Sequence, residues 1–154
     1  MTPGTYTQVY LQFVFAVKFR EALIQPNYQK EVFPYIAGLV ESMGHKSFAV
    51  NGMPDHVHVF MSFNPKHSPS ETIKEIKRAS TNFINEKNWF PGKFQWQAGY
   101  GCFSYSKSQV DKVVNYILNQ KEHHRKKSFQ QEYIDFLEKF EVDFDTSYLF
   151  EFFD

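Results

Sequence analysis

Alternation of apolar side chains in two short stretches limits the possible folds more than any other feature of this sequence. From Val9 to Val17 every odd position is Val, Leu or Phe, and positions 57, 59 and 61 repeat the pattern with Val, Val and Met. Successive side chains of a strand point to opposite faces of a sheet. Both stretches therefore predict strands that bury one face in a core, and Val14 and Ala16 extend burial to the second face of the first strand.

Helical periodicity is predicted between and after these strands. A first helix is expected from Pro26 to Gly44, where Pro34 should kink the helix or delay its start. Ser68 is a predicted N-cap, followed by Pro at the first helical position, and this second helix continues to about residue 87. Ser106 begins a third helix with a capping box, and a last amphipathic helix is expected at about residues 129–140.

The order of the elements predicts the fold class. Short strands are expected at residues 48–50 and 56–63, joined by a turn at 51–54, and residues 89–105 read as strand and loop. The order is therefore β-α-β-β-α-β followed by helices. We predict an α+β fold, a ferredoxin-like antiparallel sheet with helices on one face and appended C-terminal helices.

Charge is divided unevenly along the chain, although 17 basic and 17 acidic residues give zero formal net charge. Sixteen basic and nine acidic residues precede Ser128, whereas eight acidic residues and Lys139 follow. We expect one domain over residues 1–154 with an acidic C-terminal tail at about 141–154. A basic body is compatible with a polyanionic partner but does not require one.

Cysteine content and the N-terminal sequence predict a cytoplasmic protein with no membrane partner. Cys102 is the single cysteine, which excludes an intramolecular disulfide and a cysteine-based zinc knuckle and fits a reducing compartment. The N-terminus lacks the basic region of a signal peptide. The longest apolar stretch, residues 9–17, is far shorter than the roughly 20 residues that span a membrane.

Two pairs of polar residues are candidates for chemistry. His56 and His58 alternate with apolar residues, so they share one face of a strand and can converge on a divalent ion, although two chance surface histidines fit as well. Tyr116 and Gln120 are neighbours on one flank of a helix. They are either a nucleophile and an oxygen ligand, or a tyrosine at the edge of the core and a solvated glutamine. The other histidines, at positions 45, 67, 123 and 124, are expected at the surface.

At these residues the sequence resembles the single-tyrosine HUH transposases of insertion sequences and their REP-associated tyrosine relatives. The resemblance runs from the first strand to the tyrosine helix through four segments: Met53–Phe60, the helix at Ser68–Pro69, Trp96–Tyr100 and Asn115–Gln120. It implies that Tyr116 is the nucleophile and that Mg²⁺ or Mn²⁺ is bound by His56, His58 and Gln120. Three neutral ligands would leave the ion's charge free to polarise a phosphodiester.

The resemblance also implies an activity and its partners. We expect a homodimeric, metal-dependent transposase that cleaves and rejoins single-stranded DNA at hairpin-flanked ends through a 5′-phosphotyrosine. A non-cleaving, domesticated protein that binds hairpin DNA or RNA is the alternative. A histidine phosphodiesterase that uses water is a third reading, weakened because Phe60 stands where a further strand histidine would be. Lysines and arginines, densest at residues 123–127, are candidate phosphate contacts, and the aromatic residues of 89–105 are core or base-stacking platforms.

Overall fold

Four antiparallel strands form the central sheet of the protein. The structure, a computed structural model, describes residues 3–143, so most of the predicted acidic tail lies outside the described residues and the one-domain prediction stays a prediction. Strands follow the spatial order β2-β3-β1-β4, and each pairs antiparallel with its neighbours. Their bounds are β1 Tyr10–Ala16, β2 Lys46–Met53, β3 His56–Ser62 and β4 Gly101–Tyr105.

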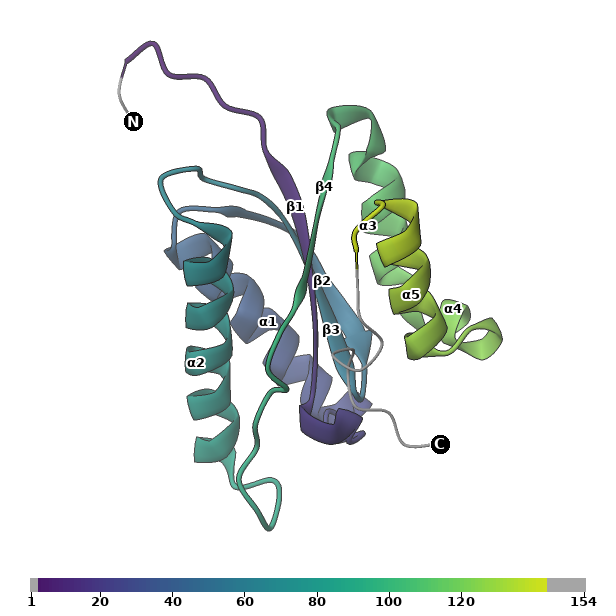
Figure 1. Ribbon diagram of the computed structural model, residues 1–154. Helices are drawn as coiled ribbons and strands as arrows, with labels where there is room; N and C mark the ends of the chain where they lie inside the picture. The colour runs from purple at the N-terminus through teal and green to yellow at the C-terminus, as the bar shows by residue number, and fades with distance from the viewer. Residues whose placement is uncertain (1–2, 144–154) are drawn as a thin grey trace.

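Helices cover both faces of this sheet in two groups (Figure 1). One face is covered by α1 (Pro26–Ser42) and α2 (Pro69–Lys87), which cross between strands as in a ferredoxin-like fold. The opposite face carries α3 (Val110–Leu118), α4 (Gln120–Lys126) and α5 (Phe129–Lys139). This arrangement confirms the predicted α+β antiparallel fold with appended C-terminal helices.

The helix boundaries show which local sequence signals determine where a helix begins and ends. The Ser68 side chain accepts a hydrogen bond from the Glu71 amide at 3.1 Å, as its N-cap role requires. α1 begins at Pro26 and continues through Pro34, so the late start is not observed. The predicted tyrosine helix is divided, because α3 has its C-cap at Asn119 and α4 begins at the next residue.

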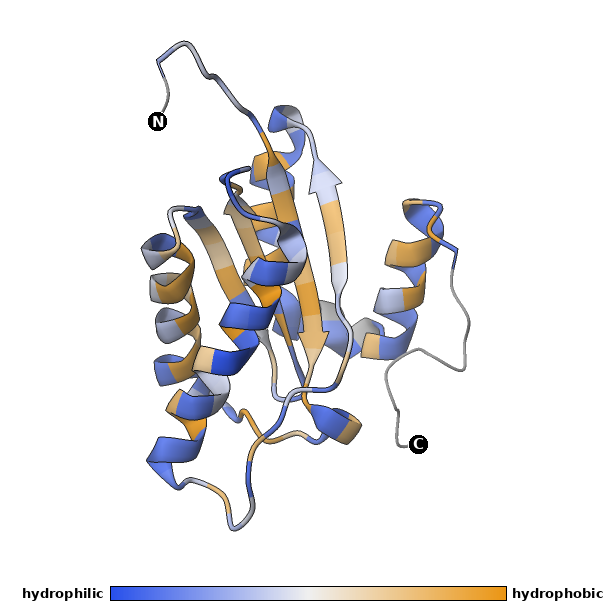
Figure 2. Cartoon of the chain, turned by 60° about the vertical axis from the view of Figure 1, so that its left-hand side comes forward, coloured by the Kyte–Doolittle hydropathy of each residue, from blue (hydrophilic) through white to orange (hydrophobic). Residues whose placement is uncertain are grey.

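An apolar core fills the space between the sheet and the helices α1 and α2. It takes the odd positions of β1 from Leu11 to Val17 together with Val57, Val59 and Met61 of β3. The orange inner surfaces of strands and helices in Figure 2 show this layer. Phe94 and Trp96 of the aromatic segment are buried in the same core, which supports the core reading for these two side chains.

Polar side chains interrupt the core on the opposite face of the sheet. Two apolar clusters lie under α3 and α5, around Phe60 and Phe103 respectively. The buried polar residues of this face are Gln12, His56, His58, Gln120 and Glu132. In the described part of the chain, no helix combines the length and the hydropathy that a membrane crossing requires.

Candidate metal and nucleophile site

His56 and His58 project together from β3 toward the helices α3–α5. Register pairs them with Ala16 and Val14 of β1, and neither imidazole has exposed surface. The shared face predicted from the sequence is therefore observed, and the reading as surface histidines is wrong. Gly52 allows the tight β2–β3 connection, because a Cβ there would lie 2.1 Å from the carbonyl oxygen of His56.

Hydrogen bonds hold each imidazole by its Nδ1 atom. Nδ1 of His56 donates to a carboxylate oxygen of Asp55 at 2.7 Å, and that carboxylate pairs with Arg20 at 3.3 Å. Nδ1 of His58 donates to Oε1 of Gln12 at 2.7 Å. In a neutral imidazole with Nδ1 protonated, Nε2 carries the free lone pair. Burial lowers the pKa of His56, which favours this neutral form.

The β-sheet also positions the helix that carries Tyr116. Asn51 of β2 donates to the main-chain oxygen of Ile117 at 2.9 Å, which fixes the C-terminal turn of α3 against the sheet. Gln120, the first residue of α4, is fully buried, so the expectation of a solvated glutamine is wrong. Its Oε1 lies 3.2 Å from Nε2 of His56. Tyr116 and Gln120 are therefore brought to the histidine pair as the sequence suggested.

Glu132 of α5 is the residue that the sequence analysis missed. Its side chain is about 4% exposed, and its Oε1 lies 3.2 Å from Nε2 of His58. Oε2 accepts hydrogen bonds from the Tyr116 hydroxyl and from Nε2 of Gln120 at 3.4 Å. One signal could have found it: Glu132 occupies the helical stripe of Phe129 and Tyr133, which is otherwise apolar and buried.

Two further histidines differ from the expectation of a surface position. His45 is buried and its Nε2 lies 3.2 Å from the hydroxyl of Thr72. The side chain of His124 is 9% exposed, and its Nε2 lies 3.4 Å from Oε1 of Glu132. Among the residues that the structure describes, that nitrogen has no hydrogen-bond partner. The imidazole of His124 therefore belongs to the edge of the same cluster.

Burial and neighbouring charges shift the pKa values of the carboxylate–phenol pair in opposite directions. Burial raises the pKa of Tyr116, and the neighbouring carboxylate of Glu132 raises it further. Burial would also raise the pKa of Glu132, but the facing histidines His58, His124 and His56 together outweigh burial and the net direction is downward. The site therefore holds an ionised carboxylate beside a protonated phenol.

The donor atoms of this cluster fit a divalent cation. One ligand atom each from His56, His58 and Glu132 lies within 4.8 Å of the others. Nε2 of His56 faces Oε1 of Gln120, so with Nδ1 protonated two lone pairs point at each other without a proton between them. A cation satisfies such an arrangement, and imidazole nitrogen with amide or carboxylate oxygen is a common ligand set for first-row divalent metals.

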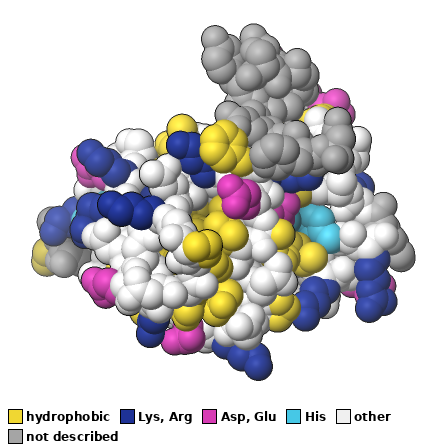
Figure 3. Space-filling view, turned by 90° about the horizontal axis from the view of Figure 1, so that it is seen from below, with side chains coloured by type: hydrophobic (Ala, Val, Ile, Leu, Met, Phe, Trp, Pro, Cys, Tyr) yellow, Lys and Arg dark blue, Asp and Glu magenta, His cyan; other side chains and the backbone are white. Residues whose placement is uncertain are grey.

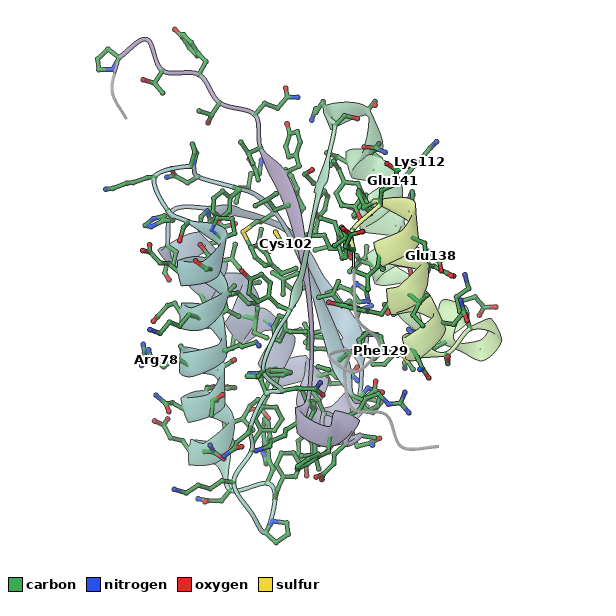
Figure 4. The ribbon with its side chains drawn as sticks, in the orientation of Figure 1. Arg78, Cys102, Lys112, Phe129, Glu138 and Glu141 are labelled. Carbon is green, nitrogen blue, oxygen red and sulfur yellow. The ribbon has the colours of Figure 1, made fainter. Side chains whose placement is uncertain are left out.

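A cavity of about 350 Å³ opens beside Tyr116 and Glu132. Its lining includes the lysines at positions 112, 127 and 139, of which Lys112 is labelled on α3 in Figure 4. Lys127 is paired with Asp135, which also lines the cavity. Ammonium groups around a cavity that reaches the half-buried Tyr116 suit a phosphate-bearing ligand.

Comparison with known proteins gives a consistent result. The family described as "Transposase IS200 like" matches residues 5–120 of this chain. The transposase TnpA of ISDra2, from Deinococcus radiodurans, is 23% identical over 124 residues, which cover 76% of this chain and 87% of that protein. Tyr116 and the two β3 histidines lie inside residues 5–120 of the family match, whereas α5 lies beyond them.

Two solved structures share the fold. A putative transposase from Deinococcus radiodurans superposes with a TM-score of 0.63 at 21% identity, covering 78% of this chain and 96% of that one. A REP-associated tyrosine transposase bound to a REP hairpin superposes with a TM-score of 0.57 at 15% identity, covering 80% and 74%. The similarity extends over most of the described residues.

Proposed function

Because the chain belongs to the IS200-like transposase family, we propose that it cleaves and rejoins single-stranded DNA with Tyr116 as the nucleophile. The supporting observation is the place of the Tyr116 hydroxyl. It contacts a carboxylate that also contacts the buried histidine pair, and it borders the lysine-lined cavity. A non-cleaving binder would have no use for this convergence of buried polar groups, which costs folding free energy.

His56, His58 and Gln120 would hold Mn²⁺ or Mg²⁺ in this proposal. Two imidazoles favour Mn²⁺ over Mg²⁺, which prefers oxygen ligands. When bound there, the ion supplies a positive charge that polarises the scissile phosphate. Asp55 and Gln12 orient the two imidazoles, so that both Nε2 atoms face the same point.

The chain's own contribution to chemistry is nucleophilic attack. The phenolic oxygen of Tyr116 forms a bond to phosphorus while the bond from phosphorus to the 3′ oxygen breaks. Products are a 5′-phosphotyrosine and a free 3′ hydroxyl, which gains a proton to match the one that the phenol loses. Because the ester retains the energy of the broken bond, attack by another 3′ hydroxyl rejoins strands without a nucleotide cofactor.

The DNA substrate is proposed from the charged residues and from one relative. Lysines at the cavity would bind phosphates, and the hairpin recorded for the REP-associated relative makes hairpin-flanked single strands the first candidate. Seen from below, Lys and Arg side chains are spread around the rim of the molecule instead of forming one patch (Figure 3).

We further propose that two chains act together in the cytoplasm. Moving a strand from one junction to another needs two covalent links held in one complex, and each chain offers one such tyrosine. β2 and β4 are the edge strands of the sheet, and either can pair with a second copy. Light scattering during size-exclusion chromatography distinguishes a dimer from the 18.3 kDa monomer.

A covalent-adduct assay tests the proposed function. Labelled single-stranded hairpin DNA with the flanks of the protein's own gene is incubated with protein and Mn²⁺, then separated on a denaturing protein gel. We expect a shifted band that disappears with EDTA and in Tyr116→Phe, but persists in Tyr100→Phe, since Tyr100 packs on Phe13 across the sheet. DNA binding should survive in both variants.

Other outcomes identify the alternatives. Tight hairpin binding with no adduct under either metal would support the non-cleaving binder. Cleavage that continues in Tyr116→Phe would support a phosphodiesterase that uses water, and would exclude Tyr116 as the nucleophile.

A further inference from the structure

We propose that Glu132 is a metal ligand supplied by the C-terminal helix α5, and that the same carboxylate holds Tyr116 beside the metal. This inference rests on the proposed function, because it assigns a further ligand to the proposed metal site. Residues matched by the family end at position 120. Glu132 thus belongs to a part of the chain outside that match, and α5 becomes part of the active site.

The position of Oε1 is that of a ligand atom. It lies 3.2 Å from Nε2 of His58, 3.6 Å from Nε2 of His56 and 3.4 Å from Nε2 of His124. Metal–ligand bonds of about 2.1–2.2 Å place adjacent octahedral ligands about 3.0 Å apart. The observed separations are close to this value, whereas 3.6 Å is too long for a hydrogen bond.

Charge gives an independent reason for a cation. Every ion pair of Glu132 among the described residues is with a histidine, and imidazoles must be neutral to bind a metal. In that state the buried carboxylate of Glu132 has no cationic partner in the described part of the chain. Removing such a carboxylate from water is strongly unfavourable unless a positive charge compensates it, and a divalent ion between Oε1 and the imidazoles would supply that charge.

The second oxygen connects the metal to the nucleophile. Oε2 accepts hydrogen bonds from Tyr116 and Gln120 while Oε1 faces the imidazoles. Helix α5 is fixed in this register by Phe129, whose ring stacks on the His56 ring with centroids 3.8 Å apart. Figure 4 shows Phe129 at the start of α5. A carboxylate that bridges in this way positions the phenol next to the ion.

Mn²⁺ binding to the full chain, without DNA, tests the proposal independently of catalysis. The electron paramagnetic resonance signal of free Mn²⁺ measures the Kd for wild type, Glu132→Gln, Glu132→Ala and the control Glu138→Gln. Glu138 is an exposed residue of the same helix and is labelled in Figure 4. We expect the Kd to rise at least tenfold in both Glu132 variants and to stay within twofold in the control.

An unchanged or lower Kd in Glu132→Gln would overturn the proposal. It would mean that the carboxylate of Glu132 forms ion pairs with protonated histidines and is not a ligand of the ion. Anomalous diffraction from wild-type crystals soaked in Mn²⁺ decides the question without a variant. An ion bonded to Oε1 of Glu132 supports it, and an ion on His56 and His58 with Glu132 turned away contradicts it. If Glu132 proves necessary for Mn²⁺ binding but wild-type protein forms no covalent DNA adduct through Tyr116, the proposed function is refuted and the metal-ligand proposal stands.

Discussion

The two faces of strand β3 use the same backbone for opposite purposes. Toward α1 and α2 the strand presents Val57, Val59 and Met61, all completely buried in an apolar core. Toward α3–α5 it presents Phe60 and the equally buried His56 and His58, whose imidazole nitrogens lie against polar partners on β1, α4 and α5. Burial is therefore the same on both faces, and only the chemistry of the buried groups differs.

This difference separates folding from function within one strand. Burial of apolar side chains stabilises the folded state in proportion to the buried area. Buried imidazole and carboxylate groups instead lose their hydration, and their polar partners in the protein do no more than compensate for that loss. The apolar face should therefore dominate the free energy of unfolding, and the polar face should dominate metal affinity. Substitutions on each face can test that separation.

The largest effect on stability is expected from the apolar face. Phe15 is completely buried and its ring packs edge-on against Trp96 with centroids 4.7 Å apart. Phe15→Ala removes this packing and leaves a cavity, so it should lower the free energy of unfolding by about 3–5 kcal/mol in urea titrations. At urea concentrations where the variant is folded, its Mn²⁺ affinity should match that of wild type. A parallel loss of affinity would show that the two faces are not separable.

A smaller effect, on metal affinity and not on stability, is expected from the residue that orients His56 on the polar face. Asp55 accepts the Nδ1 proton of His56 and pairs with Arg20. Asp55→Ala removes the group that orients His56, so Mn²⁺ should bind about 10–100-fold more weakly by calorimetry. Glu75→Ala is the matched control, because it removes a carboxylate paired with an arginine on α2. Equal affinities in the two variants would contradict the assigned orientation of His56.

Sequence reasoning succeeded where the information is local. Strand alternation placed His56 and His58 on one face because side-chain direction in a strand depends only on position. The Ser68 cap of α2 was predicted for the same reason, because the N-cap and its partner are three residues apart. Tyr116 and Gln120 came from the resemblance to a family, not from periodicity alone.

Features that depend on tertiary packing were missed. Glu132 is 74 residues from His58 in the chain, and no local pattern shows that α5 folds back over β3. Gln120 is fully buried and His124 is mostly covered in the same cluster, although a helix viewed alone would place both in solvent. The available signal was a charged residue on an apolar helical stripe. Glu132 was instead counted only as one of the acidic residues near the C-terminus, so its place on that stripe was overlooked.

The smallest expected effect comes from a polar group on the apolar side of the sheet. Lys77 of α2 donates hydrogen bonds to the main-chain oxygens of Gln97 and Gly99 at 2.9 and 2.7 Å. Burial lowers the pKa of Lys77 from 10.5 to about 8. Between pH 8 and 10.5 the unfolded chain retains a proton that the folded chain has released, so stability from this group increases with pH across that range.

Lys77→Met removes this titration, and Lys74→Met, at an exposed position of the same helix, serves as control. From pH 7.5 to 9.5 the free energy of unfolding of wild type should rise relative to Lys77→Met by less than about 1 kcal/mol, since solvent screens a partly exposed ammonium. Relative to Lys74→Met it should not change. A difference between wild type and Lys77→Met that stays constant with pH would mean that the two carbonyl oxygens stabilise the charged form enough to offset burial, and that even the apolar side of the sheet carries a satisfied charge.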